Sequence, residues 1–517
     1  MAPSLRLSWQ DLTKSLALGF MSISGTAGVS AIQIYVPQYR VDLKEWCEWT
    51  DSPFDKVSKV VGLGFRMPGP RENVYTMAAT AVLKLIQRED LDARSIGFLA
   101  LGTESSTDNA AGAVIVKGMV DRALQAMGKA GISRNCEVPE FKHACLGGIY
   151  ATKAAIRWCL LDGRDRLAIV ISADVAEYAR NSTGEQTQGA GAVAMLVESS
   201  AKMLAIDLGT SGSSSAYRGP DFRKPVARHF TAGSQHNNPL PPDGRIRDFP
   251  VFNGRYSTHC YLDQVVHACH DHLERSGLDP LELFESQGAV FFHRPYHHLP
   301  TQALATSMVF AWGRAGASGR ARLEALCAKS GCDADAAWDQ LSDQPDLESL
   351  VHSKGPDTDP YAAVTPVVKA LRASPEFRAT QTRLLRFGDD DVKELGNLYT
   401  ASLPAWLACG LADAATRPRD LASDRILAIG YGSGDAAEVL PCTLVAGWQE
   451  AAQRIDVQAT LAESHNLSKA GYAALHAGIP DSQLPAASSG RFLIESIGER
   501  EDERFQDIGI ERYQYLA

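Results

Sequence analysis

The chain has 517 residues, of which 45% are hydrophobic and 22% are charged, as in soluble globular proteins. That length suits one large domain of two halves or two to three ordinary domains. The 61 acidic residues outnumber the 51 basic ones, the net charge is -10, and no basic cluster stands out, which argues against a nucleic-acid partner. No apolar run is long enough to span a bilayer, so we expect no membrane partner.

The ten cysteines are scattered and form no Cys-x-x-Cys pair, a usage that favours free thiols in a reducing compartment. Residues 1–30 contain one short apolar patch, residues 16–21, which is too short and too poorly flanked for a signal peptide. We therefore expect an N-terminal extension over 1–30 and a cytoplasmic protein.

Short apolar runs alternate with helical patterns through the first half of the chain, which predicts an α/β fold. The predicted strands are 31–36, 96–101, 167–171, 192–197 and 204–208. The predicted helices are 73–88, 110–127 and one from the Cys145 region to about 161. We assign 31–208 to an N-terminal half.

The second half, 209–517, shows the same alternation of short apolar runs and helical patterns. The predicted strands are 288–292, 426–429 and 440–445, and a helix is predicted at 259–276. Two segments interrupt it. Residues 209–247, rich in Gly, Ser, Pro and Asn, predict a surface excursion, and residues 314–390 predict peripheral helices and loops. The charge-dense tail, 496–512, is expected to be solvated.

Cys145 stands in the stretch His-Ala-Cys-Leu-Gly-Gly-Ile-Tyr, residues 143–150, which opens a predicted buried helix. At the first turn of a helix the positive end of the dipole lowers a thiol pKa and favours the nucleophilic thiolate. Two following glycines leave room for backbone or substrate. The alternative is one more buried small cysteine.

Glu104 and His293 each follow a predicted buried strand, and loops at strand ends of α/β folds converge on one crevice. Small neighbours leave Glu104 room to act as a general base, although a carboxylate that only caps a turn fits equally well. A histidine leaving a buried strand is more often a core residue than a catalyst, so the case for His293 rests on the other two.

Two glycine-rich loops, 189–192 and 430–434, could bring backbone N–H groups to a thioester oxygen, but neither matches a P-loop or a dinucleotide signature. The run His267-Ala-Cys269-His270-Asp-His272 suggests a metal site. On a helix these side chains point in several directions, and no second pair completes a tetrahedral set, so no metal is expected.

Seven motifs occur together in a fixed order, and through them the sequence resembles the 3-hydroxy-3-methylglutaryl-CoA synthases of the thiolase superfamily. These motifs are Gly102-Thr-Glu104-Ser, Ala144-Cys145-Leu-Gly-Gly, Ala173-Asp174-Val-Ala-Glu-Tyr178, Gln188-Gly-Ala-Gly-Ala-Val-Ala-Met-Leu196, Phe292-His293-Arg-Pro-Tyr296, Gly396-Asn397-Leu-Tyr-Thr400 and Gly430-Tyr-Gly-Ser433-Gly434.

The resemblance implies a five-layered αβαβα fold with two similar halves, a homodimer, and no cofactor beyond coenzyme A thioesters as substrates. It also implies an acyltransferase that joins acetyl-CoA to acetoacetyl-CoA, a step of the mevalonate route to isoprenoids. Cys145 would carry the acetyl group, Glu104 would remove a methyl proton, and His293 would protonate the acceptor oxygen.

The resemblance extends to further residues of the site. Substrates and water would be positioned by Asp174, Asp221, Asn397 and Ser433. The backbone N–H groups of Cys145 and Gly434 would hold the thioester oxyanion.

The chain departs from the family pattern in its N-terminal extension, in its long peripheral segments, and at His298, where many members carry a lysine thought to help bind CoA. One alternative is therefore a relative that adds the acetyl unit to a β-ketoacyl chain on an acyl carrier protein, in polyketide β-branching. Two others are a ketoacyl synthase, whose scheme gives Glu104 no role, and a silent binding protein of this fold.

Overall fold

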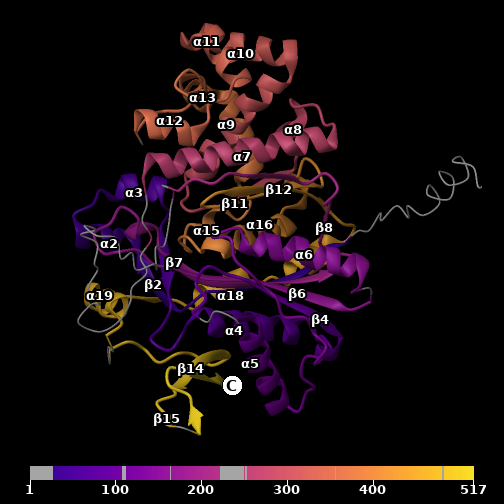
Figure 1. Ribbon diagram of the computed structural model, residues 1–517, viewed down its shortest axis with the longest axis vertical. Coiled ribbons are helices and arrows are strands. Elements are labelled where there is room, and N and C mark those ends of the chain that lie inside the picture. The colour runs from indigo at the N-terminus through magenta and orange to yellow at the C-terminus, as the bar shows by residue number, and fades with distance from the viewer. Residues whose placement is uncertain are drawn as a thin grey trace, which may run out of the picture.

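The computed structural model describes residues 27–107, 112–163, 165–219, 221, 250, 253–355, 357–479, 483–502 and 504–517. In this part of the chain two layers of strands alternate with three layers of helices (Figure 1). From the top of the view the layers are α7, then β11 and β12, then α16 and α6, then β7 and β6, and finally α4 and α5. The five-layered αβαβα arrangement is confirmed.

The two strand layers are joined by hydrogen bonds through β8. Among the described residues the strand order is β10-β11-β12-β8-β1-β7-β6-β4-β5, and β9 also pairs with β12. The bounds are β1 (Gly28–Tyr35), β4 (Ile96–Gly102), β5 (Glu140–Phe141), β6 (Leu167–Ala176), β7 (Gly189–Glu198), β8 (Leu204–Ile206), β9 (Gly212–Ser215), β10 (Ala289–Phe292), β11 (Arg425–Gly432) and β12 (Ala436–Leu444).

The strand pairing repeats between the two halves. β4 is parallel to β6 and β6 antiparallel to β7, just as β10 is parallel to β11 and β11 antiparallel to β12. The end of β4 therefore corresponds to the end of β10, which places Glu104 and His293 at equivalent points. The division of the chain between residues 208 and 209 stays a prediction.

The helices divide between the central layer and the two outer ones. Central α16 is buried around almost its whole circumference, as expected of a helix that is apolar on all sides. The bounds are α4 (Val74–Arg88), α5 (Gly112–Ala126), α6 (Gly147–Leu161), α7 (Arg255–Ser276), α8 (Glu282–Glu285), α9 (Leu299–Arg314), α15 (Asp389–Val392) and α16 (Ser402–Thr416). None of the helices in the described ranges is both long and apolar enough to cross a membrane.

A smaller subdomain lies beside the strand layers and borders the site. It contains a three-stranded sheet of β2 (Tyr39–Asp42), β3 (Gly64–Met67) and β13 (His465–Asn466). Its short helices are α2 (Leu43–Thr50), α3 (Phe54–Val60) and α19 (Lys469–Ala477), whereas α17 (Trp448–Gln453) and α18 (Val457–Ala462) pack on α16 and β1 of the main core.

The predicted peripheral helices over 314–390 are confirmed. Most of them lie above α7 at the top of Figure 1, whereas the last one packs on β10. Their bounds are α10 (Gly316–Ser330), α11 (Ala334–Ser342), α12 (Leu347–Lys354), α13 (Val364–Ala373) and α14 (Pro375–Leu385). Apolar positions at helical spacing, such as Val364, Val367 and Leu371 on α13, are buried against their neighbours and explain why this charged segment still packs.

Two segments predicted as irregular contain strands, although most described residues of the tail, 496–512, are exposed as predicted. In the predicted excursion 209–247, β9 is a strand on the edge of β12, because backbone pairing there needs no apolar pattern; residues 222–249 lie outside the described ones. In the charged tail, β14 (Arg491–Ile497) pairs with β17 (Glu511–Leu516), and β15 (Glu501–Asp502) pairs with β16 (Phe505–Gln506). Of the N-terminal extension, residues 1–26 also lie outside the described chain, and β1 begins at Gly28.

Candidate active site

Cys145 lies in a tight turn just before α6. The helix begins at Gly147 and Leu146 is its N-cap, so Cys145 precedes the helix instead of lying in its first turn as predicted. Ala144 has φ +41°, a left-handed conformation that is uncommon for a residue with a side chain. Strained backbone of this kind occurs at functional sites that the surrounding structure holds in place.

Glycines let the end of β4, the short strand β5 and the start of α6 approach one another closely around this turn. A Cβ on Gly102, at the end of β4, would lie 2.4 Å from the backbone N of Gly148. A Cβ on Gly148 would lie 2.0 Å from Ser172 Oγ, and one on Gly147 would lie 2.7 Å from the carbonyl O of Phe141. The two glycines after Cys145 therefore serve close packing of the backbone.

The structure brings Cys145 and Glu104 together. The Sγ of Cys145 donates to Oε1 of Glu104 over 3.6 Å, and the thiol is 8% exposed. A carboxylate at this distance can accept the thiol proton, which is the arrangement of an activated nucleophile.

Asp174 holds the Glu104 loop. Its Oδ1 accepts from the backbone N of Glu104 (2.8 Å) and from both N (3.0 Å) and Oγ (2.8 Å) of Ser105, and its Oδ2 accepts from the backbone N of Thr400 (3.0 Å). The Asp174 side chain is fully buried and does not line the cavity described below. The predicted role in substrate binding is therefore replaced by a positioning role, because its oxygens are already saturated by protein donors.

A cavity of about 380 Å³ adjoins Cys145 and is lined by residues from both halves of the chain. Predicted site residues in its wall are Cys145, His293, Asn397 and Ser433. Glu104 is not part of the cavity wall but contacts Cys145, which is. The thiol, the carboxylate and the imidazole thus belong to one site.

His293 follows β10 and is almost completely buried, with 1% of its surface exposed. Burial lowers the pKa of His293 to about 3, so the ring is neutral at physiological pH. Its ring stacks on Tyr431 (centroids 6.4 Å apart, 27°), and its carbonyl accepts from the Tyr261 hydroxyl (2.8 Å). A neutral imidazole in this position can donate one N–H into the cavity.

Asn397 offers its amide nitrogen to the cavity. Its Oδ1 already accepts from the backbone N of Tyr399 (2.9 Å) and from Ser402 Oγ (3.0 Å). Only the NH₂ group therefore remains to bind a ligand oxygen.

Two tyrosines complete the wall beside Cys145 and were not predicted as site residues. Tyr178 and Tyr399 pack with the thiol, with ring centroids 6.4 Å apart, and burial is the main cause that raises the pKa of each. Both hydroxyls therefore stay protonated. Both tyrosines stand in the motifs that carry the family resemblance, and this position was the signal that could have identified them as site residues. A tyrosine by itself indicates only core packing.

Gly434 does not contribute the predicted oxyanion donor in this conformation. Its backbone N–H donates to the carboxylate of Asp435, and Gly434 is not part of the cavity wall. The neighbouring Ser433 does line the cavity. Sequence could not reveal this, because the competing acceptor is the next residue along the chain and its orientation depends on the tertiary fold.

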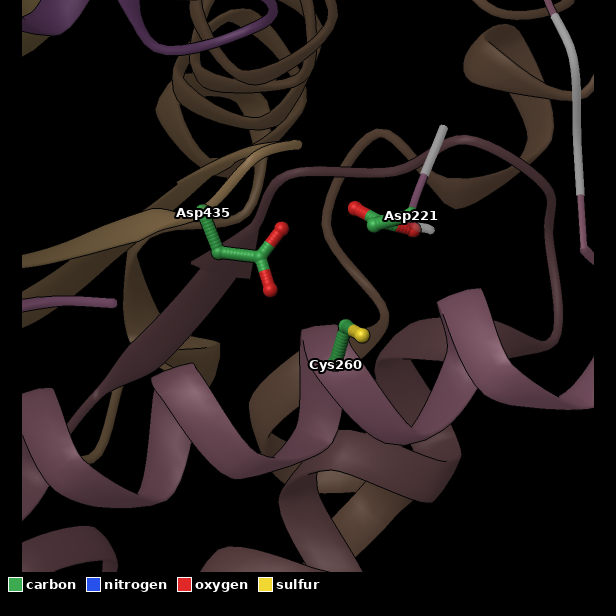
Figure 2. Close-up of side chains that lie close together, drawn as sticks. All are labelled: Asp221, Cys260 and Asp435. Atoms are coloured by element: carbon green, nitrogen blue, oxygen red, sulfur yellow. The ribbon is translucent and has the colours of Figure 1, made fainter. Parts of the chain in front are cut away.

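Asp221 lies behind the cavity wall and faces Asp435 and Cys260 (Figure 2). The hydroxyl of Tyr431, which lines the cavity, lies within hydrogen-bond distance of Oδ2 of Asp221 (3.0 Å) and of Oδ1 of Asp435 (3.0 Å). The predicted direct role of Asp221 in substrate binding is thus replaced by contact through Tyr431.

The Asp221–Asp435 pair is better suited to hold a proton than a metal ion. Burial, with the neighbouring Asp221 carboxylate as the next cause, raises the pKa of Asp435 to about 8. Its Oδ2 lies 3.1 Å from Nη1 of Arg218, a cation that would repel a metal, and burial raises the pKa of the Cys260 thiol. A coordinating thiol must be deprotonated, so this donor set fits a metal poorly.

Two family models match the chain. The model described as hydroxymethylglutaryl-coenzyme A synthase N terminal matches residues 24–202, and the corresponding C terminal model matches residues 390–476, together just over half of the chain. The chain belongs to the hydroxymethylglutaryl-coenzyme A synthase family. The matched regions contain Glu104, Cys145, Asn397 and Ser433.

Relatives from distant organisms support this membership. The hydroxymethylglutaryl-CoA synthase of Enterococcus faecalis is 26% identical over 464 residues, covering 89% of this chain and 94% of its own. The cytoplasmic hydroxymethylglutaryl-CoA synthase of Gallus gallus is 29% identical over 425 residues, covering 79% of this chain and 70% of its own.

Solved structures of hydroxymethylglutaryl-CoA synthases share the fold. MvaS in complex with 3-hydroxy-3-methylglutaryl coenzyme A superposes with a TM-score of 0.71 at 24% identity, covering 95% of this chain and 99% of its own. The HMG synthase of the curacin biosynthetic pathway, in complex with an acetyl donor-ACP, superposes with a TM-score of 0.67 at 20% identity, covering 95% of this chain and all of its own.

Proposed function

We propose that this family member condenses acetyl-CoA with acetoacetyl-CoA and water to give 3-hydroxy-3-methylglutaryl-CoA and free CoA. The observation that carries the proposal is the contact of 3.6 Å between Cys145 Sγ and Glu104 Oε1, at a cavity that also contains His293. A thiol, a base and a proton donor at one cavity are the groups that a carbon–carbon condensation on a thioester needs.

The reaction begins at Cys145. Glu104 accepts the thiol proton, the thiolate attacks the carbonyl carbon of acetyl-CoA, and the bond to the CoA sulfur breaks. The departing CoA thiolate takes the proton from Glu104. This leaves an acetyl thioester on Cys145 and a carboxylate ready to act again.

Glu104 then removes a proton from the acetyl methyl group, which is more acidic in a thioester than in an oxygen ester. The resulting carbon nucleophile forms a bond to the C3 ketone carbon of acetoacetyl-CoA. The alkoxide gains a proton through His293, whose neutral ring donates to the ketone oxygen. The proton lost from the methyl group balances the one gained by the alkoxide. Water finally cleaves the thioester and restores the Cys145 thiol.

The backbone N–H of Cys145 and the NH₂ group of Asn397 are proposed as donors to the developing oxyanions. Thr103 and Ser105, held on Asp174, keep Glu104 in reach of the thiol. The chain uses coenzyme A thioesters as substrates and needs no separate cofactor. A homodimer is proposed by analogy with the family only.

The proposal is tested by incubating the protein with acetyl-CoA and measuring its intact mass. We expect one acetyl group on wild type and none on Cys145→Ala, whereas Cys442→Ala, which removes another buried cysteine, should be acetylated normally. Adding acetoacetyl-CoA should discharge the acetyl group and release the six-carbon product. Full acetylation of Cys145→Ala would refute the assignment of the nucleophile.

A further inference from the structure

Three buried carboxyl groups lie behind the cavity wall, and one guanidinium pairs with them. Asp221, Asp263 and Asp435 are each at most 2% exposed. Among the described residues, Arg218 is the only arginine or lysine within ion-pair distance of any of the three, and it contacts Asp263 and Asp435. A carboxylate removed from water is unfavourable unless a cation or a proton neutralises it. The charges in this cluster therefore favour one bound proton.

The hydroxyl of Tyr431 lies between two of these carboxyl groups. Its oxygen is 3.0 Å from Oδ2 of Asp221 and 3.0 Å from Oδ1 of Asp435. Burial, followed by these two charges, raises the pKa of Tyr431, so the hydroxyl keeps its proton. A hydroxyl has only one proton to donate and accepts through its lone pairs. The second carboxyl group must therefore carry a proton itself in order to hydrogen-bond the same oxygen.

The other neighbours of the Asp221–Asp435 pair agree with one shared proton. Oδ1 of Asp435 also accepts from the backbone N of Gly434, and Oδ2 lies 3.1 Å from Nη1 of Arg218. Oδ1 of Asp221 is buried and has no partner among the described residues, which is unfavourable for an ionised carboxylate. The thiol of Cys260 faces the pair from α7 (Figure 2), and burial raises its pKa, so it adds no cation. Two carboxyl groups that share a site hold one proton between them.

The remaining titratable groups of the cluster surround Asp263. The hydroxyl of Tyr361 donates to it, Arg218 pairs with it, and Nε2 of His267 lies 3.7 Å from its Oδ1. On α7, Tyr256 is buried beside the cluster, and burial raises the pKa of its hydroxyl, which stays protonated. Asp263 therefore takes up most of the available positive charge, and the other two carboxyl groups are balanced by a proton.

Tyr431 connects this pair to the residues that would bind the acceptor. Its ring stacks on that of His293, with centroids 6.4 Å apart and an angle of 27°, and both residues line the cavity. The Tyr431 hydroxyl also contacts the side chain of Ser433, another residue of the cavity wall. Loss of the shared proton would leave two adjacent buried negative charges, whose repulsion separates the carboxylates. The Tyr431 hydroxyl could then no longer bind both of them.

We propose that Asp435 is a positioning residue for the condensation step. The proton that it shares with Asp221 keeps the Tyr431 hydroxyl bound to both carboxyl groups, and the Tyr431 ring in turn holds His293 toward the acceptor. When the pair loses this proton, Tyr431 is released and His293 is no longer held. The inference rests on the proposed function, because that function assigns His293 to the acceptor.

The test separates the two half-reactions. Acetyl-enzyme is formed with acetyl-CoA, and its discharge by limiting acetoacetyl-CoA is measured by rapid quench at pH 7 and at pH 9. Burial, with Asp221 as the next cause, raises the pKa of Asp435 to about 8. The ratio of the wild-type discharge rate to that of Asp435→Asn should therefore fall about tenfold from pH 7 to pH 9. Ionisation of the substrate itself cancels in this ratio.

Matched variants separate the shared proton from other effects. Asp424→Asn removes an exposed carboxylate just before β11, and its ratio to wild type should be constant. Tyr431→Phe keeps the ring and removes the hydroxyl, so its discharge should be slow already at pH 7 and should not share the wild-type fall. This second variant keeps the test decisive if Asp435→Asn does not fold. Formation of the acetyl-enzyme should show no tenfold fall in any of these proteins.

Infrared difference spectra measure the shared proton without substrate. Wild type and Asp424→Asn should lose the band of a protonated carboxyl group between pH 7 and pH 9, and Asp435→Asn should lose none. Absence of this band in wild type, or a constant ratio of discharge rates, would overturn the proposal. An equal fall in the acetylation rate would also overturn it, because the effect would then not act through His293. Failure of wild type to form an acetyl-enzyme would instead refute the proposed function.

Discussion

At the scale of single residues, the site depends on a carboxylate that is itself held by another carboxylate. Asp174 accepts hydrogen bonds from the backbone of the Glu104 loop and from Thr400 before α16. Because Asp174 is fully buried and saturated, it fixes the loop without competing for the thiol. Glu104 is therefore held facing Cys145, and little rearrangement is needed before acetylation.

Glu104→Gln keeps the size of the side chain and removes the base. We expect the acetyl-enzyme to form more slowly but to accumulate, while condensation falls by about 10²–10⁴-fold, the usual contribution of a general base. Rapid-quench mass measurements of the acetyl-enzyme, combined with product assays, give the two rates separately. Condensation at the wild-type rate would place the base elsewhere.

His293 makes the folded state sensitive to acid. Its pKa is about 3 in the folded protein against about 6.5 in an unfolded chain, so between these values the unfolded state binds more protons. Stability should therefore be complete above pH 6.5 and fall progressively toward pH 3. Thermal unfolding of His293→Gln should show a smaller loss between pH 6.5 and pH 4, and an identical loss would contradict the assignment.

At the scale of elements, the position of α6 is set by its first residues. Gly102, Gly147 and Gly148 let the end of β4 and the start of the helix approach within backbone contact. Gly148 N also donates to Thr400 Oγ1 over 2.6 Å, which ties α6 to the segment before α16. The two central helices are thus joined beside the nucleophile.

Gly148→Ala would place a methyl group 2.0 Å from Ser172 Oγ and 3.0 Å from Thr400 Oγ1. Overpacking of this kind typically costs about 1–3 kcal/mol, and the shift of α6 should also displace Cys145. Denaturant unfolding and the acetylation rate measure the two effects. Gly118→Ala, at an exposed position of α5 where nothing lies within 4 Å, is the control and should be neutral or slightly stabilising.

At the scale of the whole molecule, the two halves supply different parts of one site. Glu104 and Cys145 come from the first half, and His293, Asn397 and Ser433 from the second. The tail adds another long-range connection, because Arg491 of β14 reaches Glu463 (2.8 Å), the Tyr35 hydroxyl (3.2 Å) and Glu72 (3.7 Å). Distant segments are thus held together around buried charges.

Arg491→Met would remove the positive partner of the buried Glu72 carboxylate. Leaving a buried charge without its partner typically costs about 3–5 kcal/mol, so the urea midpoint should fall clearly. Arg512→Met, which removes an exposed guanidinium paired with Asp507, should change the midpoint little. Equal effects of the two substitutions would show that burial of the ion pair is not the cause.

Periodic segments were predictable because their apolar spacing is a local property. β4, α4 and β10 lie within a few residues of the predicted ranges, and Asn73 caps α4 through its side chain. Segments stabilised mainly by backbone pairing or charge, such as β9 and the β14–β17 pair, were missed, because their patterns carry no apolar period. The start of the helix was predicted two residues too early, at Cys145 instead of Gly147. The turn before it depends on the positive φ of Ala144, which cannot be read from the composition.

The sequence by itself determined the α/β class and the family resemblance, and it singled out three side chains as the proposed reactive groups, because motifs and periodicity are encoded locally. Only the tertiary structure decided which acceptors are already satisfied. It showed that Asp174 positions a loop, that Asp221 pairs with Asp435, and that the Gly434 N–H is occupied. It also brought Arg372 to His298 across 74 residues of chain. Hydrogen-bond saturation and charge pairing depend on distances between remote segments, and those distances exist only once the chain has folded.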